Sequence, residues 1–84
     1  MNEKMRKRAA RGMYDNAKKA AVQALGGERA FAIQGSTIRR MAIADAIFTT
    51  LALLDEGEVT DEVHRDLSID LFEYLTDDAG GDWR

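Results

Sequence analysis

The stretch from Ser36 to Glu56, STIRRMAIADAIFTTLALLDE, decides the fold of this chain. Its large apolar residues leave little polar surface; they are Ile38, Met41, Ile43, Ile47, Phe48, Leu51, Leu53 and Leu54. A helix that is apolar nearly all round is normally covered by neighbours on several sides. The stretch therefore predicts a central buried helix over about residues 36–56, with the other segments packed on it.

The composition favours one small domain over residues 1–84. A hydrophobic fraction of 45% and a charged fraction of 32% are typical of a folded chain rather than a disordered one. The absence of cysteine excludes disulfides and thiolate metal sites. The absence of proline favours long uninterrupted helices. No run is long and apolar enough to span a bilayer, so we expect a cytoplasmic protein without a membrane partner.

A second helix is predicted N-terminal to the central one, over about residues 2–25. Its apolar residues recur every three or four positions and form one stripe, which consists of Ala10, Met13, Ala17, Ala21, Ala24 and Leu25, with Tyr14 beside it. Because glycine readily takes the left-handed conformation that ends helices, Gly26 and Gly27 are expected to end this one.

A third helix is predicted over about residues 60–76, with Thr60 as its N-cap. Its inward stripe consists of Val63, Leu67, Leu71, Tyr74 and Leu75, with Ile69 and Phe72 on one flank. Residues 77–84 are rich in aspartate and glycine, which predicts a mobile acidic tail.

The connections between these helices are short. Phe31 and Ile33 alternate with alanines within residues 28–34, which fits either a short strand or a helical turn. Since no partner strand is visible, we favour a turn that places both side chains in the core. A hydroxyl of Ser36 or Thr37 is expected to cap the central helix, and Gly57 is expected to end it. The predicted fold class is all-α, a small three-helix bundle with a central buried helix.

The charges are sorted by sign along the chain. Residues 1–29 hold eight Lys/Arg and three Asp/Glu, a net charge of +5, whereas residues 55–84 hold two and eleven, a net charge of −9. The formal net charge of the whole chain is −3. This polarity is the strongest functional signal in the sequence.

Two surfaces follow from this sorting. The first is an acidic face on the third helix, where spacings of three and four place five carboxylates in one row: Glu62, Asp66, Asp70, Glu73 and Asp77. Such a row resembles the phosphates of a nucleic-acid strand, although it could equally be a solvated face. The second is a basic patch that consists of Lys4, Lys7, Arg8 and Arg11, together with Arg39 and Arg40. This patch could contact phosphates, or it could complement the acidic helix within the chain or across a dimer.

No motif indicates catalysis or a cofactor. Asp61 and His64 are one turn apart, but two ligands do not make a zinc site, and we expect an exposed histidine. The start of the central helix at Gly35 lacks the lysine and glycine spacing of a phosphate loop, so its residues are read as a plain cap. We therefore expect no enzyme activity, no cofactor and no metal.

Three hypotheses remain, and no motif identifies a family. The first is a non-enzymatic interaction protein whose acidic helix binds a basic, nucleic-acid-binding protein. In its sharpest form it is an inhibitor that mimics nucleic acid, encoded by a mobile element such as a phage against host defence, in the manner of an anti-CRISPR protein. The second is a DNA- or RNA-associated accessory protein that uses the basic patch. The third is a structural module that forms a homodimer.

Overall fold

The computed structural model describes residues 2–54, 57 and 59–80, and in this part of the chain it is all-α. The helices are α1 (Glu3–Ala24), α2 (Glu28–Ala32), α3 (Ser36–Ala52) and α4 (Asp61–Gly80). The all-α class is therefore confirmed. The three-helix count is wrong, because residues 28–32 form a short fourth helix.

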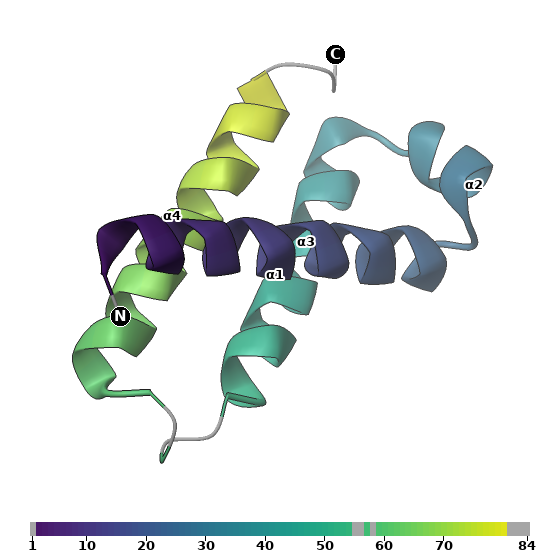
Figure 1. Cartoon of the computed structure of the whole chain (residues 1–84). Helices are drawn as coiled ribbons and strands as arrows, with labels where there is room; N and C mark the ends of the chain where they lie inside the picture. The colour runs from purple at the N-terminus through teal and green to yellow at the C-terminus, as the bar shows by residue number, and fades with distance from the viewer. Residues whose placement is uncertain (1, 55–56, 58, 81–84) are drawn as a thin grey trace.

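The helices form two layers. Figure 1 shows α3 and α4 running in opposite directions through one layer, with α1 crossing over both and α2 lying beyond the end of α1. Helix α1 packs against each of the other three. It therefore takes the position that we predicted for residues 36–56.

The core lies where α1 crosses α3 and α4. Tyr14, Ile43, Ile47 and Leu71 are the largest side chains that are fully buried. Ala10, Ala17 and Ala21 are buried along the underside of α1. Because alanine is small, it lets the α1 backbone come close to the two helices beneath it, which explains why an alanine-rich helix can occupy the crossing position.

The prediction of a central buried helix is not confirmed for α3. Only Ile43, Ile47 and Leu51 of this helix are buried, and Phe48 remains 59% exposed. Four other large apolar residues in and beside α3 are also about half exposed or more. They are Ile33 at 78%, Ile38 at 48%, Met41 at 61% and Leu53 at 80%. Since α1 covers one side of the α3–α4 layer, the other side of that layer stays open.

The predicted helix ends are partly confirmed. Helix α1 ends at Ala24, and Gly26 and Gly27 take positive φ values of 104° and 112°, as expected. The Thr60 hydroxyl accepts a hydrogen bond from the Val63 amide at 3.2 Å and caps α4. The N-cap of α3 is Gly35, which has no side-chain hydrogen bond, so the predicted hydroxyl cap is wrong.

The lengths of α3 and α4 also differ from the prediction. Helix α3 ends at Ala52, before Gly57. Helix α4 continues to Gly80, so residues 77–80 are helical rather than part of a mobile tail. The remainder of the predicted tail, residues 81–84, lies outside the described residues. The α2 region buries Phe31 but leaves Ile33 exposed, so only one of the two predicted core contacts forms.

Replacing Ile47 by alanine should lower the free energy of unfolding by about 2–4 kcal/mol, because it removes buried atoms and leaves a cavity. Ile38→Ala in the same helix is the matched control, and its effect should be below about 1 kcal/mol because that side chain is half exposed. Chemical denaturation followed by circular dichroism measures both. Equal losses from the two variants would contradict this position of the core.

Candidate functional site

A cluster of polar contacts joins α1 to α4, and Arg6 is at its centre. Its Nε donates a hydrogen bond to Asp70 Oδ2 at 2.9 Å, and its Nη1 lies 3.5 Å from Asp66 Oδ2. Asp70 is only 6% exposed, which makes it the buried charged residue of the described core. The hydrogen bond to Asp70 raises the pKa of the Arg6 guanidinium, and it outweighs the opposing effect of desolvation. A buried carboxylate without a partner lowers the stability of the fold, so the Asp70 carboxylate depends on Arg6 as its partner.

A second contact lies further along the same two helices. The Tyr14 hydroxyl donates a hydrogen bond to Asp78 Oδ2, and Lys18 Nζ lies 3.3 Å from the same oxygen. Burial, and then the bond to Asp78, raise the pKa of the Tyr14 hydroxyl well above its ordinary value. Tyr14 is fully buried, so this bond satisfies a hydroxyl that water cannot reach.

Aromatic packing connects the two polar contacts. The rings of Tyr14 and Tyr74 have centroids 5.9 Å apart, and the Arg11 guanidinium carbon lies 5.2 Å from the centre of the Tyr74 ring. The Tyr74 hydroxyl donates a weak hydrogen bond of 3.4 Å to the backbone carbonyl of Lys7. The α1–α4 crossing is therefore held by charge, hydrogen bonds and ring contacts together.

These contacts change the meaning of the predicted acidic face. Asp66 and Asp70 turn toward α1 and bind Arg6, so the five carboxylates do not form one free row. The three that remain exposed are Glu62, Glu73 and Asp77. Glu62 is eleven residues from Glu73, which leaves a gap of about 16 Å along the helix. A row of evenly spaced negative charges is therefore not present on the surface of α4.

The predicted basic patch is divided between two places. Lys4, Lys7, Arg8 and Arg11 are exposed on α1, whereas Arg39 and Arg40 lie at the start of α3. Figure 1 places the start of α3 beside α2, away from the N-terminal half of α1. Arg39 donates to the Ala32 carbonyl at 3.1 Å and so holds α2 against α3. The structure therefore brings the four α1 bases together, whereas Arg39 and Arg40 on α3 lie away from them.

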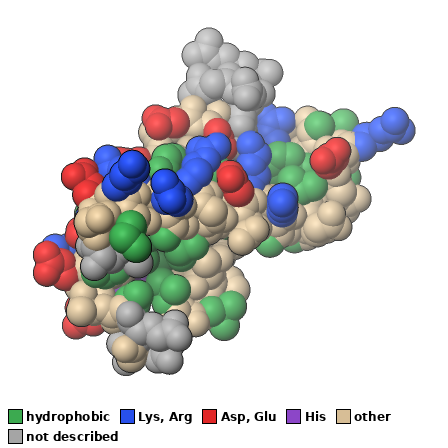
Figure 2. Space-filling model, in the orientation of Figure 1, with side chains coloured by type: hydrophobic (Ala, Val, Ile, Leu, Met, Phe, Trp, Pro, Cys, Tyr) green, Lys and Arg blue, Asp and Glu red, His purple; other side chains and the backbone are tan. Residues whose placement is uncertain are grey.

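The bases of α1 continue toward its C-terminal end. Five exposed bases are separated by three, four, seven or eight residues, so they lie along one side of α1. We call them the basic stripe, which consists of Lys4, Lys7, Arg8, Arg11 and Lys19. From Lys4 to Lys19 the stripe is about 22 Å long. Figure 2 shows several Lys and Arg side chains over α1 on the face that it presents to the viewer, with Asp and Glu side chains among them.

Two acids lie within reach of the basic stripe but neutralise little of it. Glu3 is 3.5 Å from Lys7, and Asp15 is 3.5 Å from Arg11. These are exposed pairs one helical turn apart, and such pairs contribute only about 0.3–0.5 kcal/mol. A stronger anion can therefore replace them.

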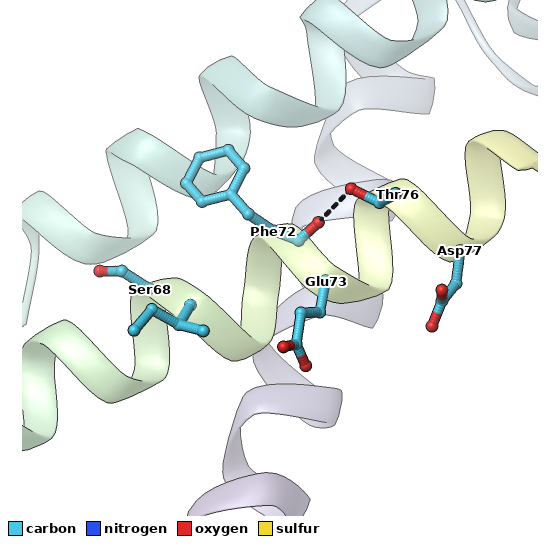
Figure 3. A pocket seen from close by; sticks show the side chains of 6 residues that line it. Ser68, Phe72, Glu73, Thr76 and Asp77 are labelled. Atoms are coloured by element: carbon cyan, nitrogen blue, oxygen red, sulfur yellow. Dashed lines mark hydrogen bonds between the residues drawn. The ribbon is translucent and has the colours of Figure 1, made fainter.

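A second exposed surface lies on α4, opposite α1. A shallow open groove there is lined by Ser68, Ile69, Phe72, Glu73, Thr76 and Asp77. Figure 3 shows Phe72 pointing toward α3 while Glu73 and Asp77 lie along the other edge, with α1 behind. The Phe72 ring packs on Phe48 of α3, with centroids 5.3 Å apart. Ile69 is 51% exposed, so this groove has an apolar floor and an acidic edge.

The described residues contain neither a cluster of metal-ligating side chains nor a helix that could cross a membrane. Nowhere in residues 2–54, 57 and 59–80 do three or more His, Cys, Asp or Glu side chains come together as a metal site would require. None of the helices in this part of the chain has the length and apolar character needed to cross a bilayer. His64 is half-buried rather than exposed, and its Nε2 lies 3.3 Å from the Leu51 carbonyl near the end of α3. The predicted exposed histidine is therefore a helix-end contact.

Sequence reasoning missed the contact between Tyr14 and Asp78. Asp66, Asp70, Tyr74 and Asp78 recur every four residues, so they share the side of α4 that meets α1. This spacing is visible in the sequence. The expectation of a mobile tail over residues 77–84 hides it, and so does the expectation of an acidic row that runs through Glu73 and Asp77.

Removing the buried charge at Asp70 tests the importance of this crossing. Asp70→Asn should lower the melting temperature by several degrees, because the Arg6 guanidinium loses its ionic partner in a partly dehydrated position. Asp77→Asn, in the same helix but exposed, is the matched control and should change the melting temperature little. If thermal denaturation gives the same shift for both, the Arg6–Asp70 contact does not hold the helices together.

The raised pKa of Tyr14 predicts how stability depends on alkaline pH. An unfolded tyrosine loses its proton near pH 10. Because the folded protein holds that proton more tightly, the unfolded state is favoured as pH rises above about 10, and the free energy of unfolding should fall. Tyr14→Phe removes this titration, so its free energy of unfolding should fall less steeply over the same range. Urea denaturation at a series of pH values measures the two slopes, and parallel slopes would contradict the assignment.

Comparison with known proteins adds no relative to this description. No protein-family model matches the chain, and neither the curated proteins nor the solved structures include a match to it. The function has to be inferred from the two surfaces of this fold, the basic stripe on α1 and the groove on α4.

Proposed function

We propose that this protein is a non-enzymatic accessory protein that binds the phosphate backbone of nucleic acid through the basic stripe of α1. The observation that carries the proposal is the separation of charge within the fold. Where α1 packs on α4, three acids of α4 form ion pairs with two bases of α1. Asp66 and Asp70 pair with Arg6, and Asp78 pairs with Lys18. Among the described residues, the ion pairs of the basic stripe are the exposed ones of Lys7 with Glu3 and of Arg11 with Asp15, so the stripe keeps most of its charge for an external anion.

The dimensions of the stripe suit this ligand. Its bases extend over about 22 Å on a straight helix, which is long enough to follow several consecutive phosphates. The crossing contacts with α4 fix the helix in place, so binding needs little reordering of the backbone. Arg11 is further constrained by its position over the Tyr14 and Tyr74 rings.

The chemistry of the stripe favours a ligand recognised by charge rather than by base sequence. Lysine and arginine on one exposed helix contact phosphates without reading base edges. Of the two described rings beside Arg11, Tyr14 is fully buried and Tyr74 packs on Tyr14 and Arg11, so we do not expect either ring to stack on bases. We therefore expect binding that depends strongly on salt and weakly on sequence.

Fluorescence anisotropy with labelled DNA and RNA duplexes tests this proposal. The wild-type protein should bind at low salt, and the logarithm of its affinity should fall linearly with the logarithm of salt concentration. The double variant Lys4→Ala/Arg8→Ala, which removes two exposed bases of the stripe, should bind at least about tenfold more weakly and should lose roughly two units of that slope.

Arg29→Ala/Arg40→Ala is the matched control, since it removes the same charge from α2 and α3. It should bind nearly as well as the wild type. Equal losses from the two double variants would show that net charge alone matters, and no binding by the wild type would overturn the proposal.

The exposed acids Glu62, Glu73 and Asp77 favour a second candidate function, the binding of a basic protein surface through α4. They support it less strongly than the sequence suggested, because Asp66 and Asp70 are taken up by Arg6. The anisotropy titration separates the two candidates: if neither DNA nor RNA binds the wild-type protein at low salt, the acidic surface becomes the better supported one.

A further inference from the structure

The middle of α1 contains a glycine that the fold does not explain. Gly12 lies inside the helix, where glycine is less favourable than any residue except proline. The positive φ values that require glycine belong to Gly26 and Gly27, at the end of α1. No described atom lies within 4 Å of the place that a Cβ on Gly12 would take, so close packing does not require this glycine either. Gly12 is exposed, and the space above its backbone is open.

The side chains around Gly12 suit an anion. Arg8 lies four residues before Gly12 and Lys19 lies seven residues after it, so two bases of the basic stripe flank the glycine on one side of the helix. Along the helix axis they are about 6 Å and about 11 Å from it. Asn16, one turn after Gly12, is also exposed, and its side-chain amide carries two N–H donors. Gly12 therefore forms a gap between longer side chains that can donate hydrogen bonds to an anion.

One acid lies beside this gap. Asp15 is three residues after Gly12, and its Oδ1 lies 3.5 Å from Nε of Arg11. Because the Arg11 guanidinium offsets its charge, Asp15 repels an anion at Gly12 less than an isolated carboxylate would. Arg8 and Lys19 then leave a positive balance around the glycine.

We propose that Gly12 is the seat of a phosphate group, where one phosphate of a nucleic-acid backbone rests against the bare helix between Arg8 and Lys19. This inference rests on the proposed function and adds the point at which the ligand comes closest to α1. A methyl group at Gly12 would hold the phosphate about 1.5 Å farther from the helix, which is the length of one carbon–carbon bond. Since Arg8 and Lys19 reach the seat from its two ends, lifting the phosphate lengthens the hydrogen bonds that both of them donate.

The charges around the seat favour a phosphate over a protein. A helix of another protein could also pack closely on a glycine. The cations on both sides of Gly12 favour an anionic group in that space instead.

Substitutions that fill the space at Gly12 test the seat. Gly12→Ala should raise the melting temperature by roughly 4–8 °C, because alanine favours the helix and meets no described neighbour. In the anisotropy titration with DNA and RNA duplexes, the same variant should bind at least about fivefold more weakly than the wild type. Gly12→Leu keeps a strong helix former but adds more bulk, so its binding should be at least about twentyfold weaker.

Ala20→Leu is the matched control, because it adds bulk at an exposed position of α1 that lines the groove toward α3 rather than the stripe. Its Kd should stay within about twofold of the wild type. Circular dichroism confirms that each variant is folded. If Gly12 served only to make α1 flexible, Gly12→Ala and Gly12→Leu would lose affinity equally, and that result would overturn the seat.

The same titration separates failure of the seat from failure of the proposed function. If the wild type binds, Lys4→Ala/Arg8→Ala weakens binding and both Gly12 variants bind like the wild type, the seat is wrong and the proposed function stands. If the wild type binds neither duplex at low salt, the proposed function is wrong and the seat is wrong with it.

Discussion

The structure depends on the contact between Arg6 and Asp70. It is the place where a buried charge meets its partner across α1 and α4, and the two residues are 64 positions apart in the chain. Apolar packing of alanines alone would allow α1 to slide or rotate over the helices beneath it, since small side chains give few directional contacts. A charged hydrogen bond with a fixed geometry removes that freedom, and the Tyr14–Asp78 contact does the same further along the crossing.

This crossing also determines which charges remain outside. Asp66, Asp70 and Asp78 meet α1, and they bind Arg6 and Lys18 there. The bases of the basic stripe on α1 are left exposed, and so are Glu62, Glu73 and Asp77 on α4. Part of the charge that is sorted along the chain is therefore used in ion pairs between α1 and α4. Only the charged side chains that remain exposed are available to bind partners.

The open side of the α3–α4 layer has the same origin. One helix, α1, covers one side of the layer, and a chain of this length has no further long helix among its described residues to cover the other. Phe48 and Ile69 thus remain half exposed although they are typical core residues. Because a domain of this size has a thin core, one layer of helices on one side is not enough to cover all of its large apolar side chains.

The sequence by itself determined the local features: the helical class, the stop at Gly26 and Gly27, and the cap at Thr60. These depend on neighbours a few residues away, and periodicity and glycine conformation report such neighbours directly. Only the tertiary structure decided which helix lies at the crossing and which acids are free. A spacing of four places Asp66 and Asp70 on one side of a helix, but nothing local says that Arg6 will lie against that side. That outcome depends on how α1 crosses α4, and the crossing is set by packing between residues distant in the chain.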